Sequence, residues 1–315
     1  MDKFMLTSRI TKLYRKLTVA EGRREVISRF TSGAYAYPNI RKVVKPFFLT
    51  AKEPDQWLFL LGCYNSGTTI LRDVLGAHPE IATLPREGVR LTSVFPRPEQ
   101  YGWTRMTTRC PSGAMVPALD DKETVRQQLI SDWAPWLRSN RPVFLEKSIS
   151  HSARLNWLLR VFPESRFIVI HRDGYSSVEG MCRKARPVGP AAIELGAKNY
   201  SLQDCAIEWD QLNRNLLEFS ANLESSRIKV IKYESLCDDP ALELANLLRF
   251  IDVSPDSLKR TGSNSVVVGE EQFEINNMNH KSHSRLSSHD FLSVNAVAGD
   301  TLKKLGYFRQ GERNG

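Results

Sequence analysis

The stretch from Trp57 to Glu80 constrains the fold more than any other part of this 315-residue chain. It begins with an apolar run, WLFLL, whose length suits a buried strand. The sequence GCYNSG follows, bounded by Gly62 and Gly67, and apolar residues then recur at helical spacing from Ile70 to Leu75. A strand, a glycine-bounded loop and a helix in this order form an anion cradle. The backbone N–H groups of the loop and the positive end of the helix dipole point at the same place.

The two glycines have the spacing of a nucleotide-binding P-loop, but Thr68 stands where an NTPase carries its lysine. That lysine contacts the β- and γ-phosphates, and the next hydroxyl holds Mg²⁺. Without the lysine, a 5′-phosphate or phosphosulfate remains compatible with the loop, whereas triphosphate hydrolysis loses its main positive charge. A P-loop kinase or NTPase stays an alternative, as does an ordinary strand-to-helix turn.

A length of 315 residues suits one large α/β domain, with two domains as the alternative. The apolar fraction of 41% and the charged fraction of 25% are ordinary for a soluble globular chain. Alternating strand and helix patterns predict a central parallel sheet flanked by helices. The five cysteines are scattered without C-x-x-C spacing, so we expect no metal site, no disulfide framework and a reducing compartment. No apolar run approaches the ~20 residues that span a bilayer, which favours a cytoplasmic location.

Residues 1–50 hold eleven Lys and Arg against three acidic residues, so +8 of the net +9 charge lies there. We expect a basic amphipathic arm over 1–50 and the main domain over 51–315. The arm's apolar side would pack on the protein body. Alternatively, residues 1–30 would lie on an anionic membrane surface, contact an anionic acceptor or act as a targeting peptide. No nucleic-acid-binding module is recognisable, so no nucleic acid is expected as a partner.

Three further strands are predicted, at Val143–Glu146, Arg166–His171 and Ile228–Glu234. In open α/β sheets, ligands bind at the carboxyl ends of the strands. Lys147 and Arg172 each follow such a strand directly, so both are candidate site residues. Arg172 also precedes a predicted helix, where its guanidinium is suited to bind a phosphate through two hydrogen bonds.

Several of these motifs resemble those of the PAPS-dependent sulfotransferases of carbohydrate or tyrosyl-protein type. SGTT followed by HPE resembles the family's 5′-phosphosulfate loop, G-x-x-[R/K]-S-G-T-T. FIVIHRDG resembles the 3′-phosphate motif, and VIKYESLCDDPALELANLLRFIDV resembles the segment after it. Two positions depart from the pattern: Asn65 replaces an Arg or Lys, and Gly180 replaces a Ser. The resemblance extends from about Gln56 to Tyr307 and implies a P-loop NTPase-like sulfotransferase fold.

The resemblance implies that PAPS is the cofactor and PAP its product. The cofactor-binding residues would be Tyr64, Asn65, Ser66, Gly67, Thr68, Thr69, Arg172, Ser177, Tyr233, Lys281 and Arg285. Ser177 lies one turn before Gly180 and is a candidate replacement for the family's serine. Lys281 and Arg285 belong to a polar segment, 276–285, that either folds over the nucleotide or is solvated.

For the reaction, Glu87 matches by position the family's catalytic glutamate and would be the general base for an acceptor hydroxyl. The alternative is an ion pair with the flanking arginines. Lys147 resembles the lysine of the family's E-K-[T/S]-P element and would stabilise charge on the transferring group. We expect a carbohydrate, glycolipid or other glycoconjugate acceptor, because Trp103, Arg105 and Arg109 suit a sugar or an anionic glycan. Asn65 and Gly180 leave a non-catalytic nucleotide- or glycan-binding relative as a further alternative.

Overall fold

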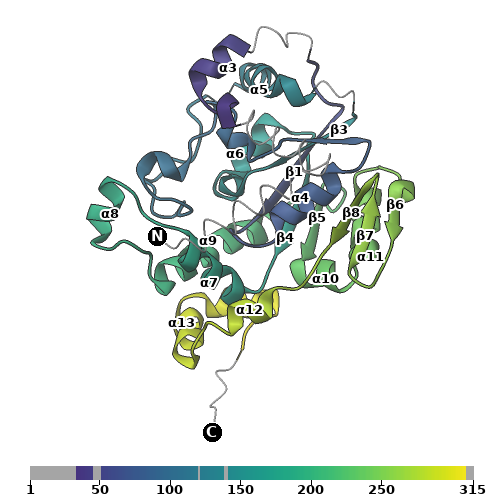
Figure 1. The fold of residues 1–315 in the computed structure, drawn as a ribbon. Coiled ribbons are helices and arrows are strands. Elements are labelled where there is room, and N and C mark those ends of the chain that lie inside the picture. Colours follow the sequence, from purple (N-terminus) through teal and green to yellow (C-terminus); the bar gives the residue numbers. More distant parts are fainter. Residues whose placement is uncertain (1–32, 45–50, 120, 138–140, 310–315) are drawn as a thin grey trace, which may run out of the picture.

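The computed structural model describes residues 33–44, 51–119, 121–137 and 141–309. Its centre is a parallel five-stranded sheet with the order β2-β3-β1-β4-β5 and helices on both faces (Figure 1). The strands are β1 (Gln56–Gly62), β2 (Ile81–Thr83), β3 (Val143–Lys147), β4 (Arg166–His171) and β5 (Ile228–Lys232). This confirms the predicted α/β architecture of P-loop type.

Side chains of the central strand alternate between two buried cores. Leu58 and Leu60 of β1 face a core shared with α4 (Thr68–Gly76) and α11 (Pro240–Phe250). Trp57, Phe59 and Leu61 face the other core, which includes α5, α6 and the end of α9. These helices span Lys122–Leu137, Leu155–Val161 and Leu202–Ala221. Because both faces are covered, the strands are apolar almost throughout, as is usual for parallel sheets.

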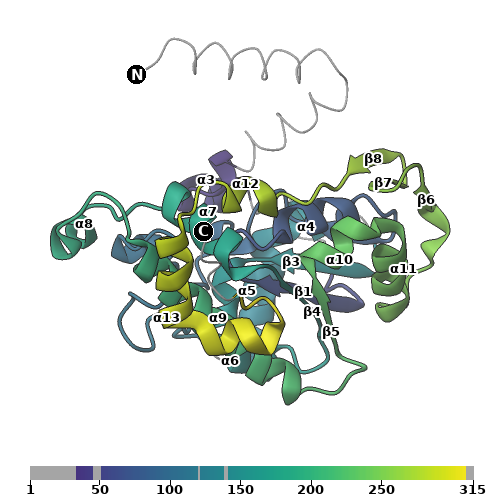
Figure 2. The same cartoon turned by 90° about the horizontal axis from the view of Figure 1, so that it is seen from below.

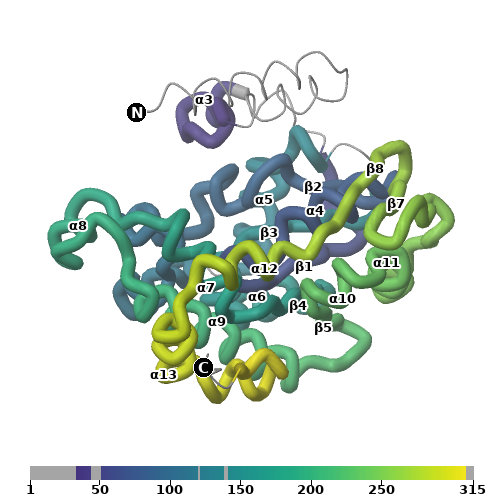
Figure 3. Tube along the Cα trace, turned by 60° about the horizontal axis from the view of Figure 1, so that its bottom comes forward, coloured from purple at the N-terminus to yellow at the C-terminus, as the bar shows by residue number. Residues whose placement is uncertain are grey.

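The C-terminal part of the chain lies beside the strand ends where ligands bind in such sheets. Helix α12 (Asn279–His283) runs alongside α7 (Gly174–Lys184), and α13 (Ser288–Leu305) packs on α9 (Figures 2 and 3). Gly306 ends α13 in the left-handed conformation that is common at helix C-termini. The remaining short elements are α3 (Pro38–Val44), η2 (Gly88–Arg90), η3 (Pro98–Tyr101), η4 (Ile149–Ala153), α8 (Pro190–Leu195) and η5 (Pro255–Ser257).

The structure differs from the predicted secondary structure in three places. The fourth predicted strand ends at Lys232, and α10 (Tyr233–Asp238) begins where the strand was expected to continue. Strand β2 at the sheet edge was not among the predicted strands. A small antiparallel sheet of β6 (Leu258–Arg260), β7 (Ser265–Val268) and β8 (Glu271–Glu274) was not predicted. Strands of three or four residues are too short to show a clear period of two.

Most of the predicted basic arm, including residues 1–30, lies outside the described residues. Its membrane contact and the boundary at residue 50 therefore stay predictions. In the part of the chain that the structure describes, no helix combines the length and the apolar character needed to span a bilayer.

Candidate active site

The glycine loop, residues 63–67, connects the end of β1 to the start of α4. Asn65 and Gly67 have φ values of 62° and 97°. Asparagine tolerates this left-handed region better than most residues. Gly67 also has no room for a side chain, because an added Cβ would lie 2.6 Å from Cδ2 of Tyr233. The sequence therefore specifies this loop conformation at two positions.

The glycine loop has the features of an anion site. The start of α4 has no side-chain cap and no acidic residue in its first turn, and the first N–H groups of a helix have no partner within it. The hydroxyl of Ser66 is buried and has no hydrogen-bond partner among the described residues. These unsatisfied donors fit the phosphate or phosphosulfate of a nucleotide. Thr68 is buried at the same helix end, and Thr69 is exposed.

On one side of the glycine loop, the structure brings together both residues predicted to be catalytic. The Nζ atom of Lys147 lies 3.1 Å from Oε1 of Glu87 and 3.4 Å from Oγ1 of Thr69. Lys147 is buried at the end of β3, whereas the Glu87 side chain is 25% exposed. The Glu87 carboxylate is thus partly accessible, and the Lys147 ammonium group links it to Thr69 at the anion cradle.

A second, fully buried carboxylate fixes the backbone beside Glu87. Oε1 of Glu146 accepts a hydrogen bond from the N–H of Gly88 at 2.9 Å, and its Oε2 lies 2.8 Å from Nε2 of His151. Burial raises the pKa of Glu146, but the His151 charge and the hydrogen bonds from His151, Ser148 and Gly88 outweigh it, so the pKa lies below its usual value. Glu146 therefore stays ionised at neutral pH and holds the Glu87 turn on β3. This role could not be predicted, because a glutamate in a strand pattern does not reveal its partners.

On the other side of the glycine loop, Arg172 follows β4 and connects three segments. Its Nη1 donates to the carbonyl of Asn65 at 2.7 Å, and its Nε donates to Oδ1 of Asn279 at 2.8 Å. Its guanidinium carbon lies 4.3 Å from the ring centroid of Tyr233. The Tyr233 hydroxyl donates to the carbonyl of Asn276 at 2.8 Å. Arg172 and Tyr233 thus lie against the loop, and Asn279 is a contact that the sequence did not reveal.

The other predicted cofactor residues differ in position. Ser177 is fully buried on α7, its hydroxyl has no partner among the described residues, and its carbonyl accepts a 3.4 Å hydrogen bond from Nδ2 of Asn65. Lys281 is exposed on α12. Nη1 of Arg285 lies 3.7 Å from Oε1 of Glu179, so this arginine already has an anionic partner. Of these three residues, the hydrogen bonds and ion pairs place Ser177 alone beside the loop.

Two cations approach the Asn65 side chain from outside the loop. Nζ of Lys184 lies 3.1 Å from Oδ1 of Asn65, and Nη1 of Arg105 lies 3.4 Å from the same atom. Burial and the charges of Arg105, Arg183 and Arg172 lower the pKa of Lys184. An incoming anion would relieve this repulsion between like charges.

The three residues expected to contact a sugar do not form a shared exposed surface: one is buried, one is ion-paired and one points to the glycine loop. Trp103 is only 4% exposed and packs near Tyr200, with ring centroids 6.5 Å apart. Arg109 forms an ion pair with Asp204, and Arg105 points to the glycine loop. Trp103 therefore offers no exposed ring face on which a sugar could stack.

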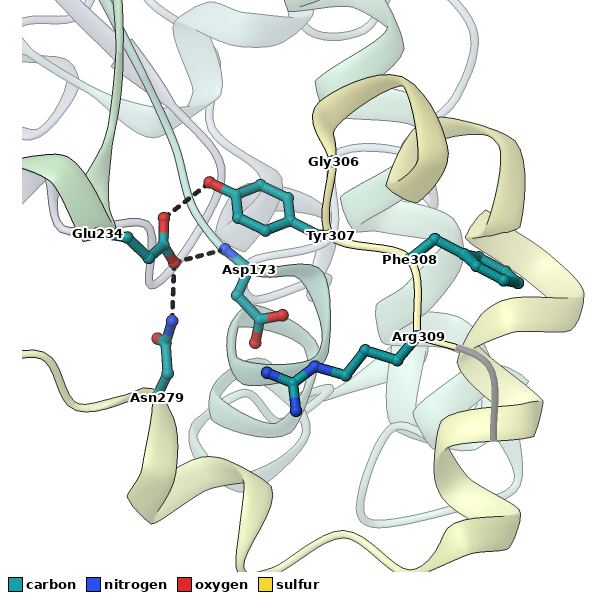
Figure 4. A pocket seen from close by; sticks show the side chains of 7 residues that line it. All are labelled: Asp173, Glu234, Asn279, Gly306, Tyr307, Phe308 and Arg309. Atoms are coloured by element: carbon teal, nitrogen blue, oxygen red, sulfur yellow. Dashed lines mark hydrogen bonds between the residues drawn. The ribbon is translucent and has the colours of Figure 1, made fainter. Parts of the chain in front are cut away.

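A cavity of about 240 Å³ lies behind Asn279 and is shown in Figure 4. The carboxylate of Glu234 accepts hydrogen bonds there from the N–H of Asp173, from Nδ2 of Asn279 and from the Tyr307 hydroxyl, at 3.1, 2.7 and 2.7 Å. No residue of the glycine loop lines this cavity, so we interpret its polar groups as the support that orients Asn279 toward Arg172. Among the described residues, no His, Cys, Asp and Glu side chains are grouped as metal ligands would be.

Comparison with known proteins agrees with this geometry. A model of the sulfotransferase family matches residues 57–257. Protein-tyrosine sulfotransferase 2 of Gallus gallus is 26% identical over 213 residues, covering 62% of this chain and 51% of that protein. Protein-tyrosine sulfotransferase 1 of Danio rerio is 28% identical over 212 residues, covering 62% and 53%. The chain thus spans about half the length of these curated relatives.

Among solved structures, sulfotransferase STF9 from Mycobacterium avium is similar with a TM-score of 0.46 and 15% identity, covering 88% of this chain and 84% of that one. The sulfotransferase domain from the curacin biosynthetic pathway has a TM-score of 0.43 and 22% identity, covering 64% and 75%. The family model covers well over half of the residues, including the glycine loop, Glu87, Lys147 and Arg172. The chain belongs to the sulfotransferase family.

Proposed function

We propose that this chain transfers the sulfuryl group of PAPS to an acceptor hydroxyl and releases PAP. The observation that carries the proposal is the position of Lys147 between Glu87 and Thr69, at 3.1 and 3.4 Å. A candidate general base next to an anion cradle supports group transfer between a bound nucleotide and a hydroxyl. Membership of the sulfotransferase family supports the same reaction class.

PAPS supplies a sulfuryl group whose bridging oxygen leaves as part of the 5′-phosphate of PAP. Glu87 would accept the acceptor's proton, and the acceptor oxygen would form its bond to sulfur as the bridging S–O bond breaks. The electron pair of that bond stays on the phosphate. Lys147 and the N–H groups of the loop would stabilise the charge that develops there. Arg172 would bind the 3′-phosphate, and the buried, unpartnered Ser177 hydroxyl is available close by.

The acceptor that we propose to test first is a tyrosyl hydroxyl in a protein. The relatives named above are protein-tyrosine sulfotransferases, which supports this choice. A phenol has a pKa near 10, so a positioned carboxylate can take its proton during the attack. The burial of Trp103 and the ion pair of Arg109 leave the carbohydrate acceptor with less support than the sequence suggested.

Calorimetric titration with PAP, and separately with ATP–Mg²⁺, tests the cofactor. We expect PAP to bind in the micromolar range and to bind more weakly when the 3′-phosphate is removed. Tighter binding of ATP–Mg²⁺ would instead favour the P-loop kinase or NTPase alternative.

Transfer of labelled sulfate from PAPS to tyrosyl peptides and to glycans tests the reaction and its acceptor. Glu87→Gln should keep PAP affinity and lose about 10²- to 10⁴-fold in transfer rate, the usual contribution of general base catalysis. Glu99→Gln is the matched control, since Glu99 lies in the same segment and pairs with Arg90 at 3.0 Å. Wild-type transfer rates in Glu87→Gln would refute the assignment of the base.

A further inference from the structure

The glycine loop carries a neutral asparagine at the position where the family pattern has a cation. We propose that Arg105, together with Lys184, supplies the positive charge that the loop lacks at the 5′-phosphosulfate end of the site. This inference rests on the proposed function and deepens it. Arg105 lies 40 residues from Asn65 in the sequence and Lys184 lies 119 residues away, yet both donate to the same Oδ1 atom.

The backbone of Arg105 is held in a conformation that arginine rarely adopts. Its φ is 60°, one of only three positive values among the non-glycine residues that the structure describes. Such strain persists where the surroundings enforce it, and it is concentrated at functional sites. The guanidinium carbon of Arg105 lies 6.0 Å from the ring centroid of Tyr64 in the glycine loop. The strained turn therefore directs this side chain to the loop rather than to solvent.

A buried carboxylate enforces that turn. Glu208, fully buried on α9, accepts four hydrogen bonds from the two threonines that follow Met106. The N–H and hydroxyl of Thr107 lie 3.0 and 2.5 Å from Oε1, and those of Thr108 lie 2.9 and 2.7 Å from Oε2. A charge held on such a preorganised turn needs little rearrangement when an anion arrives.

The second departure from the family pattern belongs to the same arrangement. A Cβ atom at Gly180 would lie 3.1 Å from Cγ and Nδ2 of Asn65. Without that atom, the Asn65 amide lies against α7 and donates from Nδ2 to the carbonyl of Ser177 at 3.4 Å. Its Oδ1 then faces Arg105 and Lys184. Gly180 thus leaves space for the Asn65 side chain, and Oδ1 of Asn65 is the acceptor for the two cations.

The proposal predicts that Arg105 acts on the 5′-phosphate alone. PAP and adenosine 3′-phosphate differ only in that group, so titrating both ligands isolates its contribution. Arg105→Ala should weaken PAP binding at least tenfold and change adenosine 3′-phosphate binding less than twofold. Arg183→Ala is the control for net charge, since Arg183 is adjacent to Lys184 but pairs with Glu179 at 2.8 Å. It should leave both affinities within about twofold of wild type.

A rescue variant makes the test independent of turnover and of folding defects. Asn65→Arg, added to Arg105→Ala, should restore most of the PAP affinity, because it returns the cation to the loop. Thermal melting checks that each variant folds. Equal PAP affinities of Arg105→Ala and Arg183→Ala would overturn the inference while the proposed function stands. Equal losses for both ligands in Arg105→Ala, or no rescue, would also overturn it. Absence of PAP binding in the wild type would remove the proposed function and this inference together.

Discussion

Replacing Gly67 with alanine tests whether the glycine loop, Tyr233 and Arg172 form one packed unit. The φ of 97° at Gly67 costs an L-residue about 1–2 kcal/mol from backbone strain alone. The added Cβ would also lie 2.6 Å from Cδ2 of Tyr233 and 3.1 Å from Cε2. Tyr233 cannot move freely, because its hydroxyl is bonded to the carbonyl of Asn276 and Arg172 lies against its ring.

The chain offers a matched control at Gly113, which has a φ of 74° and no atom of the described residues within 4 Å of an added Cβ. Gly113→Ala should therefore show the backbone strain only, about 1–2 kcal/mol. Gly67→Ala adds the overpacking of Tyr233, typically about 1–3 kcal/mol. We thus expect Gly67→Ala to destabilise the protein by roughly 2–5 kcal/mol. The excess over Gly113→Ala measures the contact between the loop and Tyr233.

Urea unfolding gives both free energies, and calorimetry gives the affinity for PAP. Because a displaced Tyr233 moves Arg172, Gly67→Ala should also weaken PAP binding more than tenfold, whereas Gly113→Ala should change it less than twofold. In a Tyr233→Ala background, the cost of Gly67→Ala should fall to that of Gly113→Ala, which a double-mutant cycle detects. Equal destabilisation by the two glycine variants, with PAP affinity unchanged in both, would refute the reasoning.

Three further predictions concern residues that the structure places around the site. Arg172→Ala removes hydrogen bonds to Asn65 and Asn279 and should abolish PAP binding in calorimetry, with a wild-type melting temperature to within a few degrees. Interaction with the Cys205 thiol holds the pKa of Cys182 below its usual value, so iodoacetamide mapping by mass spectrometry should modify Cys182 before Cys110, whose pKa burial raises to about 12. Burial raises the pKa of Glu208 in the folded state above its usual value of 4.5, despite its hydrogen bonds. Between the pKa of the unfolded state and the higher pKa of the folded state, the folded protein therefore binds more protons than the unfolded one. Stability should therefore fall as pH rises through that window, and Glu208→Gln should remove this slope in urea unfolding measured from pH 4 upward.

The parts of the site that lie next to each other in sequence could be predicted from it. An apolar run followed by a glycine-bounded loop predicts the strand, the turn and the helix together, and Lys147 and Arg172 follow strands directly. Because these strands are parallel, the residues that follow them lie at the same edge of the sheet. Tyr233 shows the limit of such reasoning. The apolar strand pattern extends to it, but Tyr233 is the first residue of α10, and its ring lies close to Gly67.

Contacts between distant segments had no sequence signal. Glu208 lies in a helical pattern where a charged residue is usually solvated, and only the approach of Thr107 and Thr108 shows why it is buried. Trp103 lies in a segment rich in proline and glycine, which predicts exposure, yet it packs against Tyr200 just before α9. The convergence of Arg105 and Lys184 on Asn65 is of the same kind, because it depends on how α7 and the turn after η3 pack.

The order of the strands divides the site into two sides. β1 pairs with β3 on one side and with β4 on the other, so the glycine loop at its end lies between Lys147 and Arg172. The β3 side carries Glu87, a partly exposed carboxylate, so in the proposed reaction a hydroxyl acceptor would arrive there. The β4 side carries Arg172, α7 and α12, which suit the nucleotide. In-line transfer needs the acceptor and the leaving group on opposite sides of the transferring atom. In the proposed reaction, the order β3-β1-β4 would supply that opposition, with the sulfuryl group above the loop between them.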